Sequence, residues 1–167
     1  AALHGLRALA LSLPEPDQAI QWQHDLRRQS GLEILDATLP NLRSAILRLK
    51  AGETVVTGLD RPVPEPKIMP VFFGRPAHLA VHHVQLAIHA KVPVVVMGAI
   101  MEADERYHIH SSGEIQMKSY LDRHTELRNN AEHILEITQD IISQALDQWV
   151  VFQPIWPEAA GFVPDKK

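Results

Sequence analysis

Short apolar runs alternate with segments of helical periodicity through residues 1–58, and this order restricts the fold more than any other feature of the sequence. The runs at residues 7–13, 32–35 and 54–58 have the length and apolar character of strands. A helix is expected in each gap between them. The resulting β-α-β-α-β order predicts a mostly parallel sheet with right-handed crossovers.

Both expected helices carry start and stop signals. Asp17 is the expected N-cap of the first helix, and Gly31 stands where a C-terminal glycine belongs. Pro40 opens the second helix and Gly52 ends it. The apolar positions of the first helix, spaced i, i+3 and i+7, are Ala19, Trp22 and Leu26.

The second part of the chain begins with a loop at 61–70, whose four prolines exclude a helix or a central strand. A helix is expected at 80–90, followed by a strand at 94–101 that should be buried because its apolar character is uninterrupted. Alternation at 106–111 predicts an edge strand that pairs antiparallel with its predecessor, and a long helix is expected at 122–148.

Length and composition indicate how many domains the chain forms and which partners it can have. A chain of 167 residues, 46% of them apolar, suits a single α/β domain spanning 1–167. We expect a mixed, mostly parallel sheet with helices on both faces, three α/β/α layers and an antiparallel edge strand. A net charge of −4 offers no basic stripe, so no nucleic-acid partner is expected. The absence of cysteine excludes disulfides, thiolate chemistry and Cys-based zinc sites.

Histidines provide a candidate metal pair. His108 and His110 share one face of the expected edge strand, a spacing that metal sites use. No third ligand is fixed by spacing, so we expect no metal and interpret both as exposed edge-strand histidines.

Several ordered segments resemble the late acyltransferases of lipid A biosynthesis, a branch of the lysophospholipid and glycerol-phosphate acyltransferase superfamily. The family pattern reads approximately Leu-Pro-Asp-Gln, Phe-Phe-Gly-x-Pro-Ala, a helix, Ala-Pro-Val-Val and a closing Gln-Trp-x-x-Phe. Arg61 replaces the family's Gln, and Leu13-Pro14-Glu15-Pro16 stands where the family often has Arg and Asn. The matching segments here are Gly58-Leu59-Asp60, Phe72-Phe73-Gly74-Arg75-Pro76-Ala77, Leu86-Ala87, Pro93-Val94-Val95, Asn130-Ala131-Glu132 and Asp147-Gln148-Trp149-Val150-Val151-Phe152.

The resemblance implies transfer of a fatty acyl group from acyl carrier protein or coenzyme A to a hydroxyl of a glycolipid or lysolipid, with no further cofactor. In such enzymes a histidine and an acid spaced His-x4-Asp or His-x4-Glu act as base and orienting group. It also implies a peripheral or anchored enzyme at the cytoplasmic face of the inner membrane, in contact with the membrane surface.

None of the ten histidines has an acid five positions later, so no catalytic residue is expected in this chain. The chain opens at Ala1 inside what reads as a helix end, and we expect a fragment whose catalytic pair lies upstream. The rival interpretation is a catalytically inactive relative that serves as a lipid-binding or scaffold module. An unrelated nucleotide-type α/β domain would need a glycine-rich loop after the first strand, and residues 13–16 do not form one.

Five residues are expected to bind substrate. Asp60 and Arg61 follow a parallel strand at the edge where α/β sheets bind ligands, and Arg61 suits an anionic head group; a loop-internal ion pair is the alternative. Gly74 and Arg75 resemble the family's pocket-lining turn, with a purely structural turn as the alternative. Phe73 is expected either in the core, with its neighbour Phe72, or in an acyl-chain channel. We expect the Asp60 and Gly74 turns to surround a shared hollow.

The C-terminal segment after the long helix is rich in proline and aromatic side chains. Trp149, Phe152 and Trp156 are expected to pack against the last helix. Contact with a membrane surface is the alternative, because Trp favours interfaces.

Overall fold

The computed structural model describes residues 8–12, 18–151 and 153–156. The chain divides into two compact units: Ala1–Gly58 with Leu86–Val92 form unit 1, and Leu59–Gln85 with Pro93–Lys167 form unit 2. The expectation of a single domain stays a prediction.

Unit 1 contains the predicted parallel sheet. Its strands are β1 (Ala8–Ser12), β2 (Glu33–Asp36) and β3 (Thr54–Thr57), in the order β2-β1-β3. Both pairings are parallel, and Leu9 lies opposite Glu33 on one side and Val55 on the other. The β-α-β-α-β order and the parallel pairing are confirmed.

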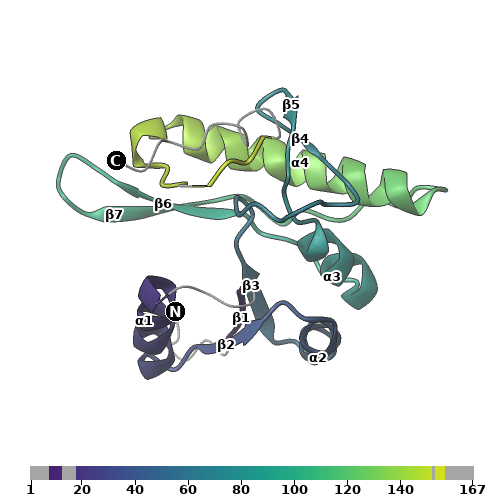
Figure 1. Ribbon diagram of the computed structural model, residues 1–167, viewed down its shortest axis with the longest axis horizontal. Coiled ribbons are helices and arrows are strands. Elements are labelled where there is room, and N and C mark those ends of the chain that lie inside the picture. Colours follow the sequence, from purple (N-terminus) through teal and green to yellow (C-terminus); the bar gives the residue numbers. More distant parts are fainter. Residues whose placement is uncertain (1–7, 13–17, 152, 157–167) are drawn as a thin grey trace. The chain divides into compact units, whose positions relative to one another are not determined.

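Two helices connect these strands: α1 (Gln18–Gln29) and α2 (Leu39–Lys50). The chain moves from β1 outward to β2 and then back across β1 to β3, so right-handed crossovers place the two helices on opposite faces of the sheet. Figure 1 shows α1 and α2 on either side of the strands. The core of unit 1 forms around Leu9, Leu11, Ala45 and Leu86.

The predicted helix signals are confirmed where the structure describes them. Gly31 and Gly52 lie two residues after the last residues of α1 and α2, and they adopt φ of 88° and 85°, the left-handed conformation of C-terminal glycines. Pro40 lies in the first turn of α2. The proposed cap Asp17 lies outside the described residues.

Helix α1 is oriented by a polar residue. His24 is buried, and its Nε2 lies 3.2 Å from the hydroxyl of Ser12 at the end of β1. Burial and the nearby Arg27 and Arg28 lower the pKa of His24. The apolar side chains of Trp22 and Leu26 are exposed.

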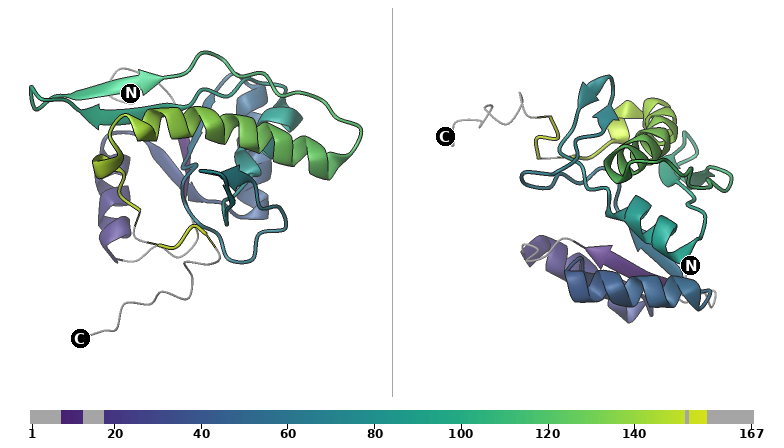
Figure 2. Two further views of the ribbon diagram at one scale, coloured as in Figure 1. Left: turned by 90° about the horizontal axis from the view of Figure 1, so that it is seen from above. Right: turned by 90° about the vertical axis from the view of Figure 1, so that its right-hand side faces the viewer.

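Unit 2 is built on one long helix and two hairpins. Helix α4 (Arg123–Ser143) contacts β4 (Val71–Phe72) of the first hairpin and β6 (Met97–Met101) of the second. Figure 2 shows α4 running alongside the β6–β7 hairpin. The remaining elements are β5 (Arg75–Pro76), α3 (His82–Ala90), whose second half belongs to unit 1, β7 (Tyr107–Ser111) and the 3-10 turn η2 (Leu146–Gln148).

The β6–β7 hairpin has one covered face. Gly98 and the buried Ile100 lie on the face that α4 covers. A Cβ added at Gly98 would lie only 2.6 Å from Cγ2 of Ile141, a residue of α4. On the other face Met97 and Met101 are exposed. The prediction of a buried strand at 94–101 is therefore wrong, because the strand begins at Met97 and α4 covers only one side of it.

The helix expected at 122–148 is shorter, because it ends at Ser143 and η2 follows it, and other expectations for unit 2 agree with the structure. The antiparallel pairing of β6 with β7 is confirmed, as is the absence of a helix or central strand in the proline-rich loop. Asp122 caps α4 by accepting a hydrogen bond from the Thr125 amide at 2.7 Å. The mixed α/β class is confirmed. None of the helices in the described ranges has the length and apolar character needed to cross a membrane.

Candidate functional site

The turn between β4 and β5 has an unusual backbone. Phe73 and Gly74 connect the two strands with φ of 48° and 72°. Two positive φ values in a two-residue hairpin loop are typical of a type I′ turn. Glycine adopts this conformation freely, but a bulky residue such as Phe73 does so only when its surroundings hold it there.

Helix α4 provides that support through two side chains. Gln139 accepts a hydrogen bond from the Phe73 amide through Oε1. Glu132 accepts one from the Val71 amide at 3.1 Å. The helix segment that begins Asn130-Ala131-Glu132 and the Phe-Phe-Gly segment are therefore bonded to each other in space, although 61 and 66 residues separate the bonded pairs.

An aromatic cluster surrounds the same turn. Phe72 is fully buried, and its ring centroid lies 4.7 Å from that of Phe73 and 5.9 Å from that of Trp149. The indole of Trp156 donates a hydrogen bond to the Phe72 carbonyl at 3.1 Å. Packing of Phe72 and of these two tryptophans is confirmed, whereas Phe152 lies outside the described residues.

Four of the five predicted substrate-binding residues lie at this aromatic cluster, and Arg61 does not. Asp60 accepts a hydrogen bond from Trp149 Nε1 at 2.9 Å, and the Arg75 guanidinium carbon lies 5.6 Å from the Trp156 ring centroid, within the range of cation–π attraction. Phe73 packs on Trp149 with its centroid 5.7 Å away, beside Gly74. Arg61 lies exposed in the loop. Their roles toward a substrate stay predictions.

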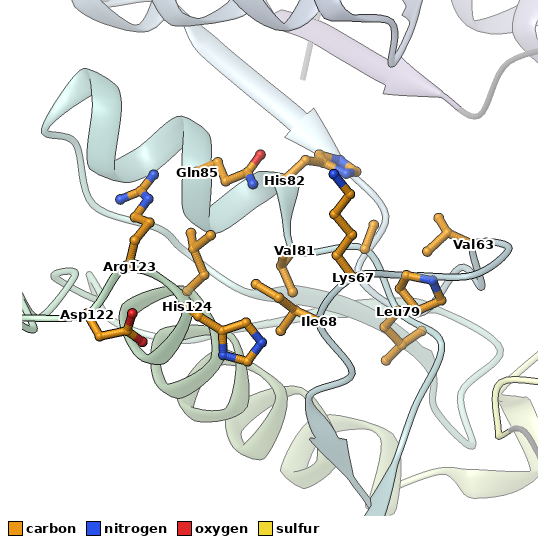
Figure 3. A pocket seen from close by; sticks show the side chains of 13 residues that line it. Val63, Lys67, Ile68, Leu79, Val81, His82, Gln85, Asp122, Arg123 and His124 are labelled. Carbon is orange, nitrogen blue, oxygen red and sulfur yellow. The ribbon is translucent and has the colours of Figure 1, made fainter.

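A hollow of about 620 Å³ lies elsewhere in unit 2. Figure 3 shows it between the proline-rich loop, the start of α3 and the start of α4. The hollow is lined by Val63, Pro66, Lys67, Ile68, Leu79, Ala80, Val81, His82, Gln85, Asp122, Arg123, His124 and Leu127.

The walls of this hollow are mainly apolar, with polar groups at intervals. Ile68, Leu79 and Leu127 are buried and supply the apolar surface. Burial lowers the pKa of His82, so its imidazole is neutral at pH 7. Lys67 contributes a cation. An apolar hollow that is edged by polar groups is the usual form of a binding site for a small ligand.

The first turn of α4 supplies a second polar edge. Hydrogen bonding from Thr125 lowers the pKa of Asp122, which is therefore a carboxylate at pH 7. Arg123 forms an ion pair with Glu126 at 2.6 Å. The edge thus carries both signs of charge.

None of the five predicted binding residues lines this hollow, so the expected cavity shared by the Asp60 and Gly74 turns is not this one. Sequence reasoning did not identify Lys67, His82 or His124 as lining residues. The sequence did contain a positional signal for each of them. Lys67 directly follows Pro66 in the proline-rich loop, and the two histidines lie in the first turns of α3 and α4. His83, next to His82, does not line the hollow, as expected for neighbours on a helix.

The histidines of the second hairpin contact acids in pairs. His108 Nε2 lies 3.8 Å from Asp104, and His110 Nε2 lies 3.6 Å from Glu102. Within the described part of the chain, no three His, Asp or Glu side chains are grouped as a metal site. The expectation that no metal is bound stays a prediction.

Comparison with protein families identifies the family of the chain. The family model described as bacterial lipid A biosynthesis acyltransferase matches residues 8–158. The matched range includes the strained turn, the aromatic cluster and every residue that lines the hollow. No curated protein sequence matches the chain at a significant level.

Proposed function

Because the chain belongs to the bacterial lipid A biosynthesis acyltransferase family, we propose that it moves a fatty acyl group from an acyl thioester to a hydroxyl of a glycolipid or lysolipid. Family membership supports a general acyltransferase role. The thioester donor, carried on acyl carrier protein or coenzyme A, and the lipid acceptor are the specific part of the proposal.

The proposed chemistry is general-base acyl transfer. A histidine takes the proton of the acceptor hydroxyl, whose oxygen attacks the thioester carbonyl. The new C–O bond forms, the C–S bond breaks, and the thiol leaves with the proton. No His-x4-Asp or His-x4-Glu spacing occurs in residues 1–167, so the proposal assigns this pair to residues upstream of this sequence.

The observation that carries the proposal is the apolar hollow in a chain of this family. A fatty acyl chain requires an apolar wall, and Ile68, Leu79 and Leu127 supply one. A head group or thioester at the mouth would meet Lys67 and the neutral His82. The proposal places the enzyme on the cytoplasmic face of the inner membrane, where its lipid acceptor lies.

The test is an acyl-transfer assay on the protein expressed from its complete open reading frame. Ala80 lines the hollow and is half-buried, so Ala80→Trp fills the space that the acyl chain would occupy. We expect kcat/KM to fall about ten-fold or more. The matched control is Ala51→Trp, at an exposed position after α2, which should retain the wild-type value.

Equal activity in both variants would show that the hollow does not hold the acyl chain. Circular dichroism and thermal unfolding of both variants separate a blocked site from a misfolded protein. Acyl chains of different length extend the test, because a partly filled hollow should penalise long chains more than short ones.

The second candidate function is a catalytically inactive relative that binds lipid or serves as a scaffold. The observation that favours it is the same absence of the His-x4-acid spacing among ten histidines. This candidate predicts lipid binding that is lost in Ala80→Trp, without acyl transfer by the protein from the complete reading frame. The two candidates therefore differ in turnover and agree in binding.

A further inference from the structure

Lys67 lines the hollow of unit 2 without a counter-ion. Its side chain is exposed and forms no ion pair or hydrogen bond within the described part of the chain. Figure 3 shows it on the side of the hollow formed by the proline-rich loop, where it extends in the direction of His82. Because burial keeps the imidazole of His82 neutral at pH 7, the lining residues on this side leave one positive charge uncompensated.

The opposite side of the hollow does not suit an anion. Figure 3 shows Asp122 and Arg123 there, at the start of α4. Glu126 neutralises the Arg123 guanidinium in an ion pair at 2.6 Å. Hydrogen bonding from Thr125 lowers the pKa of Asp122, so its carboxylate is ionised at pH 7 and repels a second anion. The charges at the hollow therefore direct a negatively charged group to Lys67.

The rest of the hollow is mainly apolar. Ile68, Leu79 and Leu127 are buried along it, and its volume of about 620 Å³ lies within the range of small-ligand pockets. An apolar cavity with one cation at its mouth complements a hydrocarbon chain that ends in a negative charge. A fatty acid has this form at pH 7 because its carboxyl group is ionised, whereas the carbonyl group of a thioester or an ester is neutral.

We propose that the hollow binds a free fatty acid, with the hydrocarbon chain against Ile68, Leu79 and Leu127 and the carboxylate at the ammonium group of Lys67. Binding itself rests on the hollow and on this charge. Its consequence rests on the proposed function: a free fatty acid occupies the space of the acyl chain and competes with the acyl thioester. Free fatty acid is therefore a reversible inhibitor of the transfer reaction.

The experiment is equilibrium dialysis of radiolabelled dodecanoate and dodecanol against the protein expressed from its complete open reading frame, at pH 8, where imidazole groups are uncharged. The two probes have the same chain length and differ in the charge of the head group. Lys67→Gln should raise the Kd of dodecanoate about three- to five-fold, because it removes one exposed ion pair, and should leave the Kd of dodecanol unchanged. The matched control is Lys118→Gln, at an exposed lysine that does not line the hollow, which should leave both values unchanged.

Ala80→Trp tests whether the probes bind in the hollow, and it should weaken both about ten-fold or more because it fills the apolar space. The inference is overturned if Ala80→Trp leaves dodecanoate binding unchanged, or if Lys67→Gln affects the two probes equally. Dodecyl phosphate serves as a third probe. Binding of dodecyl phosphate that depends on Lys67, without such binding of dodecanoate, also overturns the inference, because the hollow would then hold a phosphate head group.

Acyl transfer measured with added dodecanoate separates the two proposals. We expect dodecanoate to raise the KM for the acyl thioester and to leave kcat unchanged, as a competitive inhibitor does. Binding of dodecanoate through Lys67 by a protein that transfers no acyl group rejects only the proposed function. Acyl transfer without inhibition by dodecanoate, in a protein that does not bind it through Lys67, rejects only this inference.

Discussion

The indole nitrogen of Trp149 donates a hydrogen bond to Oδ2 of Asp60 at 2.9 Å, although 89 residues separate them in the chain. The bond joins the loop after β3 to the segment after η2. The Trp149 ring also packs against Phe73, whose centroid lies 5.7 Å away. Two residues predicted to bind substrate are therefore positioned by the same indole.

Trp149→Phe should destabilise the protein by about 2 kcal/mol, because it leaves a half-buried carboxylate without its donor. The ring contacts are largely kept, so most of the loss comes from the hydrogen bond. Urea unfolding followed by circular dichroism measures it. Asp60→Asn is the control, since an amide oxygen still accepts from the indole; a larger loss in Asp60→Asn than in Trp149→Phe would contradict this account.

Gly74→Ala should cost about 1 kcal/mol in unfolding free energy. A Cβ at Gly74 meets nothing within 4 Å, so the cost arises from the backbone conformation at φ 72°. A Cβ at Gly113 would likewise meet nothing within 4 Å, but the backbone there has no positive φ, so Gly113→Ala should be neutral or slightly stabilising. Equal effects at the two positions would exclude the type I′ turn.

Gly98→Ala should destabilise the contact between β6 and α4 by about 1–3 kcal/mol, because its methyl group would collide with Cγ2 of Ile141. Ile141→Ala removes that atom. The double variant should therefore lose clearly less than the sum of the two single losses. Strict additivity in the double-mutant cycle would show that the two residues are not in contact.

Local sequence signals predicted the elements of unit 1 because each depends on few neighbours. Gly31 and Gly52 end helices through their own backbone freedom, and Pro40 opens one through its fixed φ. The parallel order follows from the helix in each connection, because a helical crossover returns the chain to the same end of the sheet. None of these inferences needs knowledge of distant contacts.

Features that depend on distant contacts were not predictable in the same way. The apolar run at 94–101 indicated burial, but only its partner α4 decides that Ile100 is covered while Met97 is not. The hollow combines three segments that the sequence does not place together. The bond from Trp149 to Asp60 likewise depends on the tertiary structure.

The stability of the protein should fall as the pH falls below 6.5. His83 is buried without a hydrogen-bond partner at either ring nitrogen within the described chain, and burial lowers its pKa from 6.5 to about 3. Between these values the unfolded chain binds a proton at this residue and the folded chain does not. The stabilisation is therefore fully present above pH 6.5 and is lost toward pH 3, at about 1.4 kcal/mol per pH unit.

The measurement is urea unfolding of wild type and His83→Leu across that range. The variant should show a shallower decline, and it should retain part of the decline because burial also lowers the pKa of His82. At higher pH, where His83 is neutral in both states, the variant reports only the change in packing. An unchanged slope in His83→Leu would mean that this residue is not the buried neutral imidazole described here.

The central claim is tested most directly by acyl transfer in the protein expressed from its complete open reading frame. The assay follows a labelled acyl group from acyl carrier protein or coenzyme A to a lipid hydroxyl, in the wild type and in a variant whose His-x4-acid histidine is replaced by alanine. The account predicts transfer by the wild type and its loss in the variant. Equal turnover in both would contradict it.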